Sequence, residues 1–126
     1  MVIEQKAMPD NGLRKLDPEV LEKIIKEIID RIKLAMQESA GDIVMFGSYA
    51  RGDAWAESDI DIMIFTDLPK NKHHLFYRYI DDIATDICIK YHVVPTIFIQ
   101  EKIEFDRLLP ILPFYQSVRR EGRKVA

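Results

Sequence analysis

Apolar and polar residues alternate with two different periods along this chain, and the change of period predicts where it is helical and where it is extended. From residue 18 to residue 36, apolar side chains return every three or four positions, which is the period of an amphipathic helix. Asp17 is the predicted N-cap and Pro18 the first helical residue. The apolar stripe consists of Val20, Leu21, Ile24, Ile25, Ile28, Ile29, Ile32 and Met36. This stripe must face a sheet or a partner, and we interpret the charged opposite face as solvent-exposed.

Two short apolar runs follow, one before and one after a polar stretch. The first run, residues 43–46, is interrupted at Gly47 and Ser48, and residues 49–56 are predicted to form a turn and a short helix. The second run ends at Phe65. Residues 42–65 therefore predict a strand, a turn, a short helix and a second strand.

A second amphipathic helix is predicted from about Lys72 to Tyr91, after a cluster of breaker residues at 67–71. Its expected buried face consists of Leu75, Phe76, Tyr79, Ile80, Ile83, Ala84, Ile87 and Cys88. His73 and His74 stand at the expected exposed start of this helix, and His92 is a lone loop histidine. No second ligand pair stands at metal spacing, so we expect solvent-facing histidines and no zinc site.

A third strand is predicted at Val93–Ile99, and Pro95 places it at an edge or a bulge because proline cannot donate to a ladder. The tail, residues 101–126, is predicted to be helical in pieces that are broken at Pro110 and Pro113. Its expected docking face consists of Leu112, Phe114, Tyr115 and Val118. Two interpretations of its basic residues stay open, a site for a nucleotide or acidic partner and cations at a helix C-terminus. These residues are Arg119, Arg120, Arg123 and Lys124.

This order of elements predicts an α/β (α+β) domain with a small mixed β-sheet and helices packed mainly on one face. The 126 residues suffice for one domain, which we place at residues 17–126. Residues 1–16 are polar, show no sustained period and are predicted to form an N-terminal arm.

Charge and composition narrow the function. A net charge of −3 argues against binding to extended nucleic acid, which requires a cationic surface. No signal-peptide pattern and no apolar run of membrane-spanning length occur, so we expect a cytoplasmic protein without a membrane partner.

The chemistry is concentrated between residues 47 and 61. Side chains of a strand alternate between its two faces, so Asp59 and Asp61 share one face, roughly 7 Å apart along the strand. Two carboxylates at this spacing can converge on a divalent cation, which would remove their mutual repulsion. Gly47 can take backbone angles closed to other residues, and Ser48 is predicted to cap the short helix. Free N–H groups there predict a phosphate-binding turn.

Gly47-Ser48, ten intervening residues and then Asp59-Ile60-Asp61 resemble the signature of the DNA polymerase beta type nucleotidyltransferase superfamily. The surrounding residues are similar to the minimal nucleotidyltransferases, which include the antitoxin half of HEPN/MNT toxin–antitoxin pairs. The resemblance implies the transfer of a nucleoside monophosphate from ATP or another NTP to a hydroxyl acceptor. It also implies a Mg²⁺ site, with two ions possible, held by Asp59 and Asp61 as catalytic residues, and a helical HEPN-type partner protein.

Two further residues are nucleotide-binding candidates with alternatives. Arg51 either neutralises a triphosphate or pairs with Asp53 or Glu57 on the surface. Ser58 bonds either a phosphate or the backbone.

The sequence departs from the family on the third strand, where active members carry a third carboxylate. This strand has no acid here, and Thr96 occupies the expected position. Glu101, Glu104 and Asp106 are possible substitutes from the next segment. The alternative function is therefore a catalytically degenerate nucleotide-binding or antitoxin-like regulatory subunit.

Overall fold

The computed structural model describes residues 16–55 and 58–126, and most of the predicted elements form within them. Helix α1 spans Pro18–Met36, and the Asp17 side chain accepts a hydrogen bond from the Glu19 N–H at 3.1 Å, as the N-cap prediction required. The predicted arm lies outside the described residues apart from Leu16. In the described part of the chain, no helix combines the length and the apolar composition needed to cross a membrane.

A mixed sheet of four strands in the order β3-β2-β1-β4 forms the centre of the domain. Strands β1 (Ile43–Phe46) and β2 (Ile60–Thr66) are antiparallel, as are β1 and β4 (Arg123–Lys124), whereas β2 and β3 (Pro95–Glu101) are parallel. Pro95 begins β3, which is an edge strand, so the proline needs no ladder donor and this prediction is confirmed.

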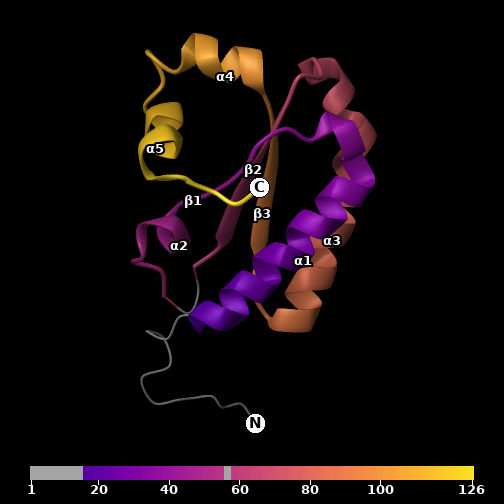
Figure 1. Cartoon of the computed structure of the whole chain (residues 1–126), viewed down its shortest axis with the longest axis vertical. Helices are drawn as coiled ribbons and strands as arrows, with labels where there is room; N and C mark the ends of the chain where they lie inside the picture. Colours follow the sequence, from indigo (N-terminus) through magenta and orange to yellow (C-terminus); the bar gives the residue numbers. More distant parts are fainter. Residues whose placement is uncertain (1–15, 56–57) are drawn as a thin grey trace.

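Helices cover the two faces of the sheet unequally, and Figure 1 shows both layers. The long helices α1 and α3 (Tyr77–Tyr91) pack on one face, as predicted, against Ile43, Ile62 and their neighbours. The shorter helices α4 (Lys102–Leu108) and α5 (Pro113–Glu121) pack on the other face, around Phe65. Since β1 and β2 are covered on both faces, their apolar residues point both ways and form two cores.

The start of the second long helix differs from the prediction. Residues Lys70–Phe76 form a 3₁₀-helix, η4, and the α-helical period begins only at Tyr77. Both Leu75 and Tyr79 were predicted to be buried, and both are exposed. Leu75 is 56% exposed because the α-helical spacing does not extend back into the 3₁₀-helix. Tyr79 lies within α3, next to the buried Ile80. The prediction for His73 was wrong: its ring is buried, and its Nε2 lies 3.0 Å from the carbonyl oxygen of Leu68, which precedes the 3₁₀-helix.

The tail also contains an element that the sequence did not predict. Arg123 and Lys124, for which cations at a helix C-terminus were one of two open interpretations, form β4 beside β1. Gly122 allows the chain to pass from α5 into this strand, because a Cβ there would overlap the Val118 carbonyl oxygen and the Val44 side chain. Pro113 begins α5 and does not interrupt a helix, since its missing N–H is not needed at the first helical position.

Candidate active site

Gly47 and Asp61 meet where β1 ends and α2 (Ser48–Arg51) begins. Gly47 has φ +76° and ψ −158°, a backbone region that is almost exclusive to glycine. The Oδ2 atom of Asp61 lies directly against its Cα, in the space that a Cβ would occupy. The strand pairing places Phe46 opposite Asp61, so the chain makes its turn beside the carboxylate. Gly47 therefore determines how closely Asp61 approaches the turn.

The turn into α2 leaves N–H groups available for an acceptor. Gly47 is the N-cap and Ser48 the first residue of the helix, so the prediction that Ser48 caps it was wrong. No side chain caps this helix, and its first N–H groups have no hydrogen-bond acceptor among the described residues. Tyr49 anchors α2 in the core, and burial raises the pKa of its phenol above the usual value. This rigid turn supports the predicted phosphate-binding role of Gly47 and Ser48.

Asp59 and Asp61 form the acidic part of the site. Asp61 is the second residue of β2 and partly buried, whereas Asp59 precedes the strand and is exposed. Burial raises the pKa of the Asp61 carboxyl, the charge of Asp59 raises it further, and the guanidinium of Arg51 acts in the opposite direction. The pair is therefore electrostatically strained without a cation. Mg²⁺ is commonly held by one or two carboxylates together with substrate phosphates, so these two residues fit it.

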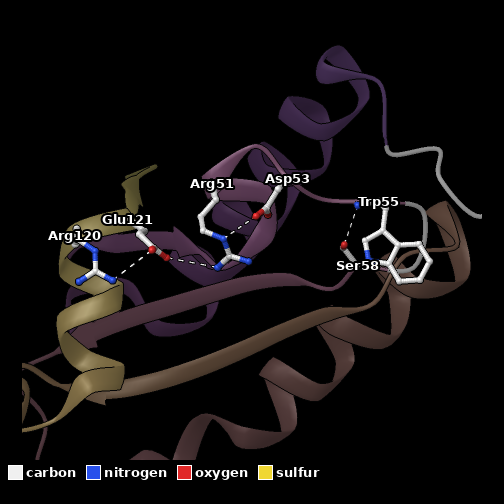
Figure 2. A network of polar contacts seen from close by, with 6 residues as sticks. All are labelled: Arg51, Asp53, Trp55, Ser58, Arg120 and Glu121. Atoms are coloured by element: carbon white, nitrogen blue, oxygen red, sulfur yellow. Dashed lines mark hydrogen bonds and ion pairs between the residues drawn. The ribbon is translucent and has the colours of Figure 1, made fainter.

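Arg51 lies beside the acids and is itself held in place. Its Nε atom bonds Asp53 Oδ2 at 3.1 Å, and its Nη1 atom lies 3.5 Å from Glu121 Oε1. Figure 2 shows that Glu121, which also contacts Arg120, reaches Arg51 from α5. Both sequence-based interpretations of Arg51 are thus compatible with its position: it pairs with Asp53, and it is close enough to Asp61 to lower the pKa of that carboxyl. Glu57 lies outside the described residues.

Ser58 stabilises the loop that leads into β2. Its Oγ accepts a hydrogen bond from the Trp55 N–H at 2.9 Å (Figure 2). Its own N–H donates to the Trp55 carbonyl oxygen at 2.9 Å. The structure thus shows a backbone contact of Ser58, which was one of the two alternatives. Binding to a phosphate stays a prediction.

Sequence reasoning missed Glu121 as a member of the site. It lies 70 residues from Arg51 along the chain, and its position depends on how α5 packs over the sheet. No local pattern in the sequence marks it, because an isolated glutamate at a helix end is common.

No third carboxylate accompanies the pair in the described structure. Thr96, the residue expected at the position of the third carboxylate, is in register with Asp61. The described residues contain no group of three or more His, Cys, Asp or Glu side chains able to hold a metal. The suggestion that Glu101, Glu104 or Asp106 substitutes was wrong. Because β3 runs parallel to β2, Glu101 is in register with Thr66, roughly 16 Å along the strand from Asp61. Glu104 and Asp106 follow in α4, where Asp106 pairs with Lys102.

Comparison with known proteins gives a consistent result. The model of the nucleotidyltransferase domain family matches residues 20–124. A Methanocaldococcus jannaschii protein named putative protein adenylyltransferase is 35% identical over 102 residues, which cover 81% of this chain and 94% of that protein. A second protein of this name from the same organism is 34% identical over 85 residues, 67% of this chain and 82% of its own length.

Solved structures share the fold at lower identity. One, described as a putative nucleotidyltransferase from Sulfolobus solfataricus, has a TM-score of 0.53 and 20% identity, and the match covers 84% of this chain and 79% of that one. Another, a crystal structure of a toxin–antitoxin with AMP-PNP, has a TM-score of 0.52 and 18% identity, over 80% of this chain and 71% of that one. At these identities the likeness shows the fold alone.

Replacing Gly47 by alanine tests the contact with Asp61. We expect Gly47→Ala to lower the free energy of unfolding by more than the roughly 1–3 kcal/mol that a strained backbone conformation costs, because the new methyl group also displaces the carboxylate. Gly52→Ala is the matched control, since Gly52 also has positive φ (+86°) but has nothing within 4 Å of the added Cβ. Denaturant titration measures both, and equal losses would contradict the steric role of Gly47.

Replacing Asp61 by asparagine tests the electrostatic strain. The carboxyl of Asp61 ionises near its ordinary pKa of 3.8 in the unfolded chain and at higher pH in the folded one, so the folded state loses stability as pH rises through this window. Without divalent cations, we expect Asp61→Asn to be more stable than the original protein at pH 7, and the difference to vanish below pH 3.8. Asp82→Asn, at an exposed position of α3, is the control. Thermal unfolding across pH measures the effect, and a destabilised Asp61→Asn at pH 7 would refute it.

Proposed function

Because the chain belongs to the nucleotidyltransferase domain family, we propose that it transfers AMP from ATP to a hydroxyl group of a partner protein. The observation that carries this proposal is the contact between Asp61 and the Gly47 turn. It brings a carboxylate pair that could hold a cation next to a set of uncapped N–H groups, and a nucleoside triphosphate with its cation needs both.

Each residue of the site has a role in this proposal. Asp59 and Asp61 would hold Mg²⁺, which when bound neutralises phosphate charge and lowers the pKa of an acceptor hydroxyl. The N–H groups after Gly47 would bind the terminal phosphates, and Arg51 would contribute a positive charge to them. The acceptor oxygen forms a bond to the α-phosphorus while the bond from that phosphorus to the bridging oxygen breaks. Pyrophosphate leaves with the electron pair. The hydroxyl proton goes to solvent, since the described residues place no third carboxylate beside Asp59 and Asp61 to take it.

The choice of nucleotide and partner rests on the relatives. Those reported above are named putative protein adenylyltransferase, which supports ATP as the donor and a protein as the acceptor. The toxin–antitoxin structure with AMP-PNP has the same fold and supports a toxin as the partner, with this chain as its antitoxin. The helical HEPN type of that toxin is what the sequence resemblance implies. The cytoplasmic location expected from the sequence belongs to the same proposal.

One observation favours the alternative of a degenerate regulatory subunit. Thr96 occupies the register position of the missing carboxylate, and none of the three suggested substitutes lies nearby. A positioned base contributes about 10²–10⁴-fold in rate. Its loss makes a slow enzyme, whereas a regulatory subunit would bind the nucleotide and transfer nothing.

Label transfer distinguishes the two functions. The protein is incubated with α-labelled ATP, Mg²⁺ and a candidate helical HEPN-type partner, chosen from the proteins encoded beside its gene. We expect label on the partner. We expect the Asp59→Asn, Asp61→Asn double variant to transfer label at least about 10³-fold more slowly, because it lacks both proposed ligands of the cation that stabilises the phosphate charge. The Asp81→Asn, Asp82→Asn double variant removes two neighbouring exposed aspartates of α3 and should retain activity. Magnesium-dependent ATP binding without any transfer would support the regulatory alternative.

Installing the missing acid is a second test. We expect Thr96→Asp to raise the transfer rate by about 10²-fold or more at saturating Mg²⁺, because the new carboxylate would stand beside Asp61 and accept the hydroxyl proton. Thr85→Asp, an exposed position on α3, adds the same charge away from the site and should have no effect. An unchanged rate in Thr96→Asp under single-turnover conditions would show that a base at this position does not limit the reaction.

A further inference from the structure

The order of the strands assigns a direction to the proposed reaction. Strand β2, which carries Asp61, lies between β1 and β3. The turn proposed to bind the phosphates, Gly47 and Ser48, follows β1, so the leaving pyrophosphate would lie on the β1 side of Asp61. In phosphoryl transfer the entering and leaving oxygens lie roughly in line across the phosphorus. The acceptor hydroxyl therefore has to approach from the β3 side, over Thr96.

The β3 side is an open edge of the sheet. Among the described residues, no strand pairs with the outer edge of β3. The Ile60 N–H bonds the Val94 carbonyl oxygen, so by the alternation of a strand the backbone groups of Ile97 and Ile99 point away from β2. Residues 93–99 contain no charged side chain, although exposed edges are usually protected by charge. This edge is suited to an uncharged partner surface.

Two phenylalanine rings extend this surface beside the acids. Phe98 is 42% exposed, and it follows Thr96 by two positions, so both side chains are on the face that carries Asp61. Phe114, at the start of α5, is 50% exposed. Both rings pack on Phe46, with centroids 5.9 Å and 5.7 Å from its ring. The aromatic cluster is thus held by the core but leaves two ring faces accessible.

We propose that Phe98 and Phe114, together with the β3 edge, form the docking surface for the acceptor protein. This rests on the proposed function. The occupant is a protein surface on which apolar side chains surround the acceptor hydroxyl. When these side chains cover the rings of Phe98 and Phe114, the hydroxyl comes to lie over Thr96. Exposed aromatic patches beside a reactive centre have the composition of interface anchors. The nucleoside of ATP stays attached to the α-phosphorus, and its bond points away from the line that joins the entering and leaving oxygens. The nucleoside therefore does not have to occupy this surface.

The test uses the full-length protein, ATP and the unmodified helical partner. Phe98→Thr keeps a strand-forming residue, and Phe114→Ala keeps a helix-forming one, so folding should survive and is checked by thermal unfolding. We expect each change to raise the KM for the partner roughly tenfold while the Kd for Mg-ATP stays unchanged. Calorimetric binding of the partner without ATP should weaken by a similar factor. Tyr77→Ala removes an equally exposed aromatic ring from α3 and should change neither quantity.

Other results would overturn the proposal in separate ways. A weaker Kd for Mg-ATP with an unchanged KM for the partner would assign the rings to the nucleobase. A self-associating protein that dissociates on Phe98→Thr would assign the surface to a second copy of the chain. If the KM and the Kd for the partner and the Kd for Mg-ATP all stay unchanged, the rings do not bind the acceptor protein. Failure of the proposed function gives a different result, because the unsubstituted protein then transfers no label to the partner. Calorimetry without ATP still shows in that case whether the two rings bind the partner.

Discussion

The approach of Asp61 to the Gly47 turn is the constraint on which the rest of this structure depends. It requires a residue without a side chain, in a backbone conformation that only glycine tolerates, at the end of a strand paired directly with β2. The cores on both sides of the sheet hold this pairing. Tyr49 fixes the short helix on one side, and the cluster around Phe65 and Phe105 fixes the other. The two like charges stay close together because the packing on both faces of the sheet holds β1, the turn and β2 in place.

The two faces of the sheet have different tasks. One is covered by α1 and α3 and consists almost entirely of aliphatic side chains, so it contributes stability through burial. The other carries Asp61, Thr96 and the aromatic cluster, and α5 covers only part of it. Through Glu121 this helix also holds Arg51, so the C-terminal segment both packs against the site and shapes its charge.

Local reasoning succeeded where short-range rules decide the outcome. The capped start of α1, the two strands around the turn and the edge position of Pro95 follow from periodicity and backbone chemistry, and they were predicted. It failed where the chain forms a 3₁₀-helix before α3, because the change of helix type changes which side chains face the core. His73 is buried there and Leu75 is exposed, the reverse of the prediction. It also failed for β4, because a strand of two residues has no period to detect and exists only through its pairing with β1.

The sequence by itself determined the family, the turn and the acid pair, because these residues lie within 15 positions of each other and one strand-turn-strand unit brings them together. The tertiary structure alone decided whether Glu101, Glu104 or Asp106 could complete the site. The parallel pairing of β2 with β3 carries them to the far end of the sheet and leaves Thr96 beside Asp61. Contacts between distant segments, such as Arg51 with Glu121 and Phe46 with Phe98 and Phe114, depend on the packing of whole elements, which no local pattern encodes.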